Sequence, residues 1–359
     1  MRLLVELFSV LKGAVEEGVF PGAVLGISVK GERYIIGAGY KSLTPFLEPI
    51  EETDVFDLAS LTKPLGLTFA LMYLLEKSPL LDLKAPLGRY IEIDTPLKDV
   101  PVYRLLNHTS GLKAWYPFYE ELLQHPLERR RSLLIKRIFS LPLEYSPGEK
   151  SLYSDLGFYV MEHLVELIWG QRLEEAFSKA KSVIPFSKKS FFDFKPLKKG
   201  LDQEKVAPTS VCPWNRILLR GIVEDENTRS LGGVSGAAGL FGNIYGVLDV
   251  LEFLIDCYKA RSQKLSQNTI FQFMHHRDPV SDYALGFMLP SEKEKELLKG
   301  KVTDFALRHT GFTGTSFFID PEKELIIVLL SNRVHPDRSN VKIREFRPYL
   351  HSKVLELVN

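Results

Sequence analysis

Ser60-Leu61-Thr62-Lys63-Pro64 is the stretch that decides the fold, and it places a hydroxyl and an amine three residues apart. Residues three apart share one face of a helix, so the Lys63 amine can reach the Ser60 oxygen. Proline is tolerated in a first helical turn, because the N–H that it lacks would go unpaired there. Pro64 therefore predicts that an apolar helix begins near Leu61, with Ser60 at its mouth.

The Ser-x-x-Lys spacing recurs elsewhere in the chain. The expected local structure around each match, rather than the spacing, therefore identifies the reactive serine. Five Ser-x-x-Lys matches are present, starting at Ser9, Ser60, Ser110, Ser178 and Ser339. Four of them lie in amphipathic surface helices or polar turns, and only Ser60 opens a long apolar helix. At a helix mouth the Ser60 N–H is free to donate. The helix dipole is expected to favour an oxyanion there and to keep Lys63 unprotonated.

The bulk composition is that of an ordinary folded chain. The 359 residues are 45% hydrophobic and 25% charged, which suits about two domains. A net charge of +1 gives no basic field for a nucleic-acid partner. Cys212 and Cys257 form no disulfide framework, and no apolar run is long enough for a membrane span.

The first residues could be mistaken for a signal peptide. Their apolar side chains are interrupted by Glu6 and Lys12, which is the spacing of an amphipathic helix. We therefore expect no cleaved signal and a cytoplasmic location.

Strand-like runs at both ends of the chain predict one antiparallel sheet built from both termini. They are residues 22–29, 34–39, 315–319 and 325–330, with 284–288 as a possible fifth strand. A final helix is expected over 347–358. Residues 1–79 and 232–359 are predicted to form the sheet domain, and residues 80–231 a mostly helical insertion domain.

Two further polar motifs, an aromatic cluster and a histidine pair stand out along the chain. Tyr153-Ser154-Asp155 follows a Pro-Gly turn, and His309-Thr310-Gly311 precedes a predicted strand hairpin. Trp115, Tyr116, Phe118 and Tyr119 cluster in the insertion, where they could form its core or line a pocket. His275 and His276 are adjacent, so their side chains diverge and predict a solvated face rather than a metal site.

The three polar motifs, in this order and with this wide spacing, resemble the class C β-lactamase-like serine hydrolases. That superfamily includes β-lactamases, DD-peptidases, D-amino-acid amidases and β-lactamase-like esterases. Supporting segments are Pro21–Val24, Leu105–Leu112 and Gly239–Phe241, so the resemblance covers about residues 20–335. It implies an α+β, β-lactamase/DD-peptidase-like fold, in which helices flank an antiparallel sheet and a helical domain is inserted.

The resemblance also implies a role for each matching residue. Ser60 is the expected nucleophile, and Lys63 its proton acceptor, alone or shared with Tyr153. Tyr153 would also protonate the leaving group and activate the deacylating water. The backbone N–H groups of Ser60 and Phe312 form the expected oxyanion hole. Substrate contacts are expected from Asp155, His309, Thr310 and Gly311, with no metal or organic cofactor.

Two departures from the family pattern affect the expected substrate. Asp155 stands where Asn is more usual and cannot donate a hydrogen bond when ionised. His309 stands where Lys is more usual and is largely neutral at pH 7. Both argue against an efficient β-lactamase. A carboxylic ester hydrolase is the first expectation for this predicted enzyme.

A D-amino-acid or muropeptide peptidase or weak β-lactamase is the second expectation, and a non-hydrolysing penicillin-binding or sensor module the third. The expected partner is a small ester, amide or short peptide. The oligomeric state is left open.

Overall fold

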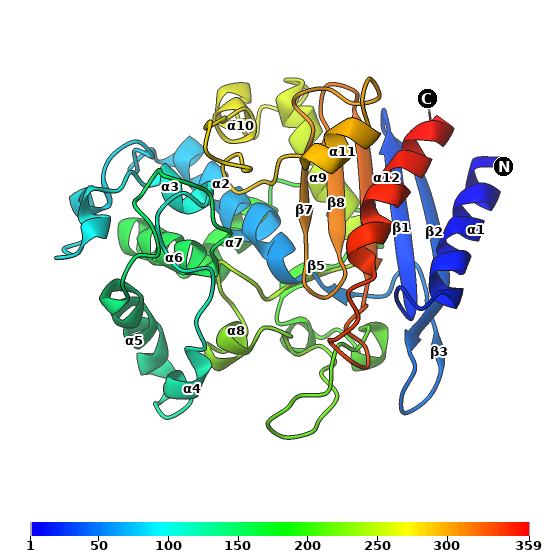
Figure 1. The fold of residues 1–359 in the computed structure, drawn as a ribbon, viewed down its shortest axis with the longest axis horizontal. Helices are drawn as coiled ribbons and strands as arrows, with labels where there is room; N and C mark the ends of the chain where they lie inside the picture. The colour runs from blue at the N-terminus through cyan, green and yellow to red at the C-terminus, as the bar shows by residue number, and fades with distance from the viewer. Residues whose placement is uncertain (1, 359) are drawn as a thin grey trace.

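A six-stranded antiparallel sheet forms one side of the molecule in the computed structural model, which describes residues 2–358. The strand order is β3-β2-β1-β9-β8-β7 (Figure 1). The strands are β1 Gly22–Val29, β2 Glu32–Ser42, β3 Glu48–Pro49, β7 Leu307–Thr310, β8 Ser316–Asp320 and β9 Leu325–Ser331. Because β1 pairs with β9, the N-terminal and C-terminal hairpins meet in the middle of the sheet, as the sequence predicted.

Alternate side chains of the central strands enter two separate cores. Leu25 on β1 lies opposite Leu329 on β9, and both pack under α1 (Arg2–Glu16) and α12 (Ile343–Val358). Val24 and Leu330 are likewise register partners and point to the other face, which α9 (Ile244–Tyr258) covers. Strand side chains alternate between faces, and a sheet apolar on both faces needs helices on both.

The other side of the molecule is mostly helical (Figure 1). Its helices, with the shorter ones of the sheet side, are α2 Phe69–Lys77, α3 Tyr103–Leu106, α4 Tyr119–Leu122, α5 Leu127–Ser140, α6 Asp155–Trp169, α7 Leu173–Lys181, α8 Glu226–Ser230, α10 Gln267–Met274 and α11 Glu292–Leu297. A small second sheet has the order β4-β6-β5, from Phe56–Asp57, Leu240–Gly242 and Phe192–Phe194. The predicted domain boundaries near residues 80 and 231 stay a prediction.

The helix that carries Ser60 begins where Pro64 placed it, but its first turns are irregular. Ala59–Leu61 form a 3₁₀ turn, Lys63–Thr68 follow as a wider π-helical segment, and α2 continues from there. The whole of Lys63–Thr68 is buried. Pro64 supplies no N–H to the first turns, and π-helical segments often occur at functional sites.

Two predicted boundaries were wrong. Residues 284–288 make single bridges, Tyr283 with Met288 and Met288 with Arg308, because Gly286 takes a positive φ of 84° that ends the extended run. The edge strand is β7 instead. The last helix begins at Ile343 and continues through Pro348, so it is one turn longer than expected. No helix within residues 2–358 has the length and apolarity to cross a membrane.

Candidate active site

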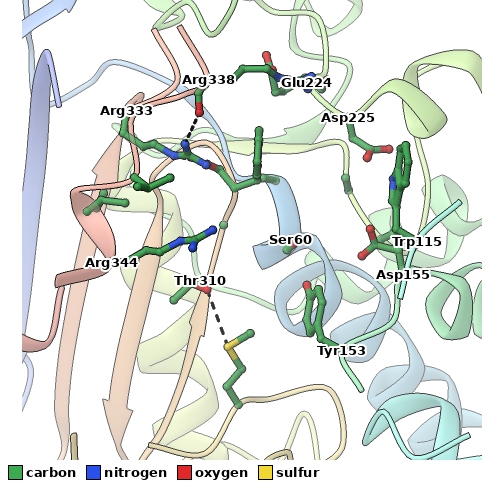
Figure 2. Close-up of a pocket in the computed structure, with 18 of the residues that line it drawn as sticks. Ser60, Trp115, Tyr153, Asp155, Glu224, Asp225, Thr310, Arg333, Arg338 and Arg344 are labelled. Carbon is green, nitrogen blue, oxygen red and sulfur yellow. Dashed lines mark hydrogen bonds and ion pairs between the residues drawn. The ribbon is translucent and has the colours of Figure 1, made fainter. Parts of the chain in front are cut away.

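Ser60 and Lys63 meet Tyr153 and Asp155, which follow at least 90 positions later in the sequence, at one point between the two sides of the molecule. The Lys63 Nζ lies 3.1 Å from the Ser60 Oγ and 2.7 Å from the Asp155 Oδ1. It also lies 4.9 Å from the centre of the Tyr153 ring. Figure 2 shows the Tyr153 hydroxyl directed toward Ser60. The trio named from the sequence is therefore brought together.

The partners of the Lys63 amine determine which group can exchange a proton with it. A third acceptor, the Ala237 carbonyl, lies 3.0 Å from Nζ, and the side chain is 0% exposed. The Ala237 carbonyl and the Asp155 carboxylate can only accept, so each takes one N–H. A protonated Lys63 gives its third N–H to Ser60. An unprotonated Lys63 has only a lone pair left, and that lone pair faces the Ser60 hydroxyl.

Lys63 differs from the sequence expectation in its charge. Burial alone lowers the pKa of Lys63, but the negative charge of Asp155 outweighs burial and holds the pKa above the ordinary value. The expectation of an unprotonated amine was therefore wrong for the resting site. A carboxylate at 2.7 Å acts on the ammonium more strongly than the partial charge of a helix end.

Tyr153 is held as a neutral phenol. Burial raises the pKa of Tyr153, and the nearby Lys63 ammonium offsets this only in part. Its ring packs between two histidines, with centroids 4.6 Å from His108 and 6.2 Å from His309. A neutral phenol beside Ser60 can donate a proton to a leaving group, which is one of the roles expected of Tyr153.

The two expected oxyanion donors are both unengaged. Neither the Ser60 N–H nor the Phe312 N–H donates to another group in the described chain. The turn that carries Phe312 is tied to the segment just before Ser60, because the Thr315 hydroxyl donates to the Leu58 carbonyl at 3.0 Å. A Cβ on Gly311 would lie 2.7 Å from that same carbonyl. Glycine at 311 thus allows the close approach that brings the two donors together.

Two buried ionisable side chains support the backbone around the two donors, Arg347 on the Phe312 side and Asp57 on the Ser60 side. Arg347 on α12 donates to the carbonyls of Gly311 and Thr315 at 3.0 and 2.8 Å. Asp57 accepts the backbone N–H of Ala59 at 2.9 Å and that of Glu224 at 2.7 Å. Burial raises the pKa of Asp57 to about 7. Ala59 itself has a positive φ of 47°, a strained conformation for a residue with a side chain.

His309 and Thr310 point in different directions from β7. Thr310 and Gly311 line the cavity beside Ser60, in agreement with their expected place. His309 is 0% exposed, does not line the cavity, and bonds to the Thr310 carbonyl through Nδ1. Burial, with the Lys63 charge, lowers the pKa of His309 well below its usual value. A direct substrate contact by His309 stays a prediction, and its position behind Tyr153 does not favour it.

A cavity of about 750 Å³ opens over Ser60 and has two unlike walls. We define the cationic wall, on the sheet side, as Arg333, Arg338, Arg344 and Arg347. We define the acidic wall, on the helical side, as Trp115, Asp155 and Asp225. Figure 2 shows Ser60 between the two walls.

Arg344 is the one cationic-wall residue without a protein partner among residues 2–358. Arg333 donates to the Phe312 carbonyl at 2.8 Å, and Arg338 binds Glu224 at 2.5 Å. No hydrogen bond or ion pair joins the Arg344 guanidinium to any described residue. Its side chain points into the cavity on the side of Thr310 (Figure 2).

Sequence reasoning missed Arg344, Asp57 and the Ala237 carbonyl. Arg344 is one of many arginines, and only the packing of α12 directs it into the cavity. A backbone acceptor such as Ala237 leaves no signature in residue type. Within the described ranges, no group of three or more His, Cys, Asp or Glu side chains is placed to hold a metal ion.

The comparisons with known proteins place the chain in a family. The Beta-lactamase family matches residues 7–180 and 195–348. An N-acetylmuramyl-L-alanine amidase of Bacillus subtilis (strain 168) is 31% identical over 352 residues, covering 88% of this chain and 78% of the relative. A putative D-alanyl-D-alanine carboxypeptidase of Salmonella enteritidis PT4 is 28% identical over 333 residues, covering 85% and 76%.

Solved structures share the fold at lower identity. A β-lactamase/D-alanine carboxypeptidase from Pseudomonas syringae superposes with a TM-score of 0.73 at 16% identity and covers 100% of both chains. EstCE1, a hydrolase with promiscuous acyltransferase activity, gives 0.72 at 19% identity and covers 99% of this chain and 98% of its own. The α+β fold implied by the sequence is confirmed, and the chain belongs to the Beta-lactamase family as a serine hydrolase.

Proposed function

We propose that this enzyme hydrolyses an amide bond in a short peptide that carries a free carboxylate, through a covalent Ser60 acyl-enzyme. The observation that carries the proposal is the unpartnered Arg344 guanidinium, which faces the cavity opposite the reactive groups. A guanidinium binds a carboxylate through two parallel hydrogen bonds. A simple ester has no group that would use it.

The comparisons support the same choice. The relatives at 28–31% identity are named as an amidase and a carboxypeptidase, both of which act on amide bonds. The likeness to EstCE1, at 19% identity, supports the fold and not the substrate. Peptide cleavage, the second expectation from the sequence, therefore moves ahead of carboxylic ester hydrolysis.

The proposed reaction uses the groups in a fixed order. The Ser60 Oγ attacks the amide carbonyl, while its proton passes to the lone pair of Lys63. The backbone N–H groups of Ser60 and Phe312 hold the developing oxyanion, where one donor is typically worth about a hundredfold in rate. Tyr153 or Lys63 protonates the departing amine as the C–N bond breaks. Water then attacks the acyl-enzyme and restores Ser60.

A pair of matched substrates tests the proposal. An N-acyl dipeptide with a free C-terminal carboxylate and its C-terminal amide differ only in the group that Arg344 would bind. We expect mass spectrometry to show faster cleavage of the free acid, and a mass increase on Ser60 during turnover. Cleavage of p-nitrophenyl butyrate alone would instead support the ester hydrolase.

A fluorescent penicillin separates the remaining alternative. Stoichiometric labelling of Ser60 without cleavage of either peptide would overturn the proposal in favour of a non-hydrolysing sensor. Peptide cleavage that survives in Ser60→Ala would overturn the site itself.

A further inference from the structure

His108, which follows α3, packs against Tyr153 and takes part in no step of the proposed reaction. It is 1% exposed and does not line the cavity over Ser60. The ring centroids of His108 and Tyr153 are 4.6 Å apart. Tyr283 contacts the imidazole at 4.3 Å and Phe158 at 5.4 Å, measured between ring centroids. Because His108 does not face the cavity, it can act on the reaction only through its neighbours.

Two hydrogen bonds to His108 bracket Tyr153 along the chain. The Leu152 N–H donates to the His108 carbonyl at 2.9 Å. The Ser154 N–H donates to the His108 Nδ1 at 3.0 Å. The residues immediately before and after Tyr153 are thus both held by one residue of a separate segment. The backbone of Tyr153 is fixed from both sides, and its hydroxyl is directed toward Ser60 (Figure 2).

The backbone of His108 has the conformation that this double contact needs. Its φ of 61° lies in the left-handed region, which is uncommon for a residue other than glycine. In this conformation the ring and the carbonyl both reach the segment around Tyr153. The Tyr145 hydroxyl donates to the same carbonyl at 3.0 Å. Strained residues of this kind occur where the surrounding structure determines their conformation, and they cluster at functional sites.

The bond to Nδ1 also determines the protonation state of the His108 ring. An imidazole nitrogen accepts a hydrogen bond only when it carries no proton, so His108 is neutral with its proton on Nε2. Burial, with the charge of Lys63, lowers the pKa of His108 well below its usual value, which agrees with a neutral ring. Nε2 has no hydrogen-bond partner among residues 2–358. The polar contribution of the ring is therefore the acceptor at Nδ1.

Ser154 connects this acceptor to the start of α6. The Ser154 hydroxyl accepts the N–H of Gly157 at 3.3 Å and donates to the Lys113 carbonyl at 2.6 Å. Ser154 is 1% exposed, so its N–H would have no alternative acceptor if Nδ1 were removed. A phenylalanine at 108 would pack on the same rings and leave that N–H unpaired. Ring packing alone therefore does not account for a histidine at this position.

We propose that His108 is a positioning residue, whose Nδ1 acceptor holds the Tyr153 hydroxyl in place beside Ser60. The proposal rests on the proposed function and takes Tyr153, rather than Lys63, as the group that protonates the departing amine. Loss of the acceptor lets the Tyr153 segment shift, while Ser60 and Lys63 stay on their own helix. Misplacing an aligned group by about 1 Å can cost about a hundredfold in rate.

Three variants separate the acceptor from the ring. His108→Phe keeps an aromatic ring and removes the acceptor. His108→Asn offers a side-chain oxygen near the place of Nδ1, and asparagine is enriched at positive φ. Tyr145→Phe is the matched control, because it removes the other side-chain hydrogen bond to His108 and leaves Nδ1 untouched.

The dependence of the rate on the leaving group is the decisive measurement. A departing amine needs a proton, whereas p-nitrophenolate leaves as an anion, so the two substrates are a peptide amide and a p-nitrophenyl ester with the same acyl group. We expect His108→Phe to lower kcat/KM by roughly 10- to 100-fold for the amide and by less than about threefold for the ester. His108→Asn should recover most of the loss, and Tyr145→Phe should match the wild type. Equal losses on both substrates, or no recovery in His108→Asn, would overturn the proposal.

Nitrogen NMR of isotope-labelled histidines tests the acceptor without any measurement of activity. The resonances that disappear in His108→Asn identify His108. We expect them to be those of a neutral ring protonated on Nε2 at pH 7. A ring protonated on Nδ1 would overturn the proposal, because it could not accept the Ser154 N–H.

The outcomes for this proposal and for the proposed function are distinguishable. If the wild type cleaves no peptide, the amidase function fails, and the ethyl ester of the same acyl group replaces the amide, since ethoxide also needs a proton to leave. A loss in His108→Phe confined to the ethyl ester then supports the role of His108. If the wild type cleaves the peptide and His108→Phe loses equally on both substrates, the positioning role fails and the amidase function stands.

Discussion

The two walls of the cavity use their charges for different purposes. On the cationic wall, Arg333 and Arg347 donate to carbonyls of the turn that carries the Phe312 N–H, and Arg338 pairs with Glu224. On the acidic wall, Asp155 binds the reactive Lys63. The cationic wall therefore holds the backbone of the site in place, and the acidic wall controls the charge of Lys63. Arg344 breaks the pattern of its own wall, and for that reason we assign it to the substrate.

Replacing Ser60, which lies between the two walls, has the largest expected effect on activity. Ser60→Ala should lower peptide cleavage by at least about 10⁴-fold, because loss of the nucleophile in related chemistry costs up to about 10⁶. Single-turnover kinetics and mass spectrometry of the acylated protein measure this. Ser178→Ala is a matched control, since Ser178 belongs to another Ser-x-x-Lys match and is exposed on α7. A similar loss in both variants would contradict the assignment.

Arg344→Gln tests the exception on the cationic wall. Losing a charge-assisted pair should lower kcat/KM for the free-acid peptide by roughly 10- to 100-fold. The same peptide with an amidated C-terminus should change little. Arg344→Lys should lie between, because it keeps the charge but not the planar fork. Equal losses on both peptides would mean that Arg344 supports the wall like its neighbours.

Asp155→Asn tests how the acidic wall acts on Lys63. Lys63 must lose a proton before it can accept one, and its raised pKa places that step at alkaline pH. Other titratable groups near this pair are Tyr153, His108, His309 and Asp225. Removing the carboxylate charge lowers the pKa of Lys63. The acidic limb of the pH–rate profile should therefore move down by about 1–3 pH units.

The rate at which a fluorophosphonate labels Ser60 measures the acidic limb of the pH–rate profile directly, because labelling does not depend on substrate binding or deacylation. Below the wild-type limb, the Asn variant should react faster than the wild type. An unmoved limb, or a shift to higher pH, would show that Asp155 does not control the charge of Lys63.

We expect Glu294→Gln to act on the cationic wall only by lowering the free energy of unfolding of the protein. Glu294 on α11 pairs with Arg308 on β7 at 2.8 Å and lies 3.4 Å from His351 on α12. Burial raises the pKa of Glu294, but His351 and Arg308 outweigh it and bring it to about 2. We expect the variant to lose about 2 kcal/mol of unfolding free energy at pH 7.

The pH dependence of the unfolding free energy lost in Glu294→Gln tests whether the ionised carboxylate is the cause. A lowered carboxyl pKa stabilises the fold above the ordinary value of about 4.3, and this stabilisation disappears as the pH falls toward 2. Urea unfolding at pH 7 and pH 3 should therefore give a smaller difference between the two proteins at the lower pH. A constant difference would exclude the ionised carboxylate as the cause.

Residue patterns predicted most of the sheet and the reactive trio, because both depend on local signals. Short β-rich apolar runs bounded by turns predicted β1, β8 and β9, and Pro64 predicted the start of the Ser60 helix. The trio followed from motifs whose residue types carry the chemistry. The family implied by those motifs was confirmed along with the fold.

The features of the fold and the site that the sequence did not predict depend on tertiary packing, which no local pattern encodes. The charge of Lys63 is set by Asp155, which arrives from a separate helix, and Arg344 reaches the cavity only because α12 packs on the sheet. Gly286 ended a strand that its neighbours favoured, because its φ is positive. The cluster from Trp115 to Tyr119 divides between core and cavity, which residue type alone could not decide.

The pairing of β1 with β9 has a consequence for synthesis on the ribosome. Ala23 lies opposite Ser331, so about 300 residues must leave the exit tunnel before the first hairpin gains its neighbour. Phe312 and Arg344 emerge in the same late interval. A nascent chain thus carries Ser60 and Lys63 without the second oxyanion donor until Phe312 has been synthesised, and the sheet that supports this donor is completed only when β9 follows.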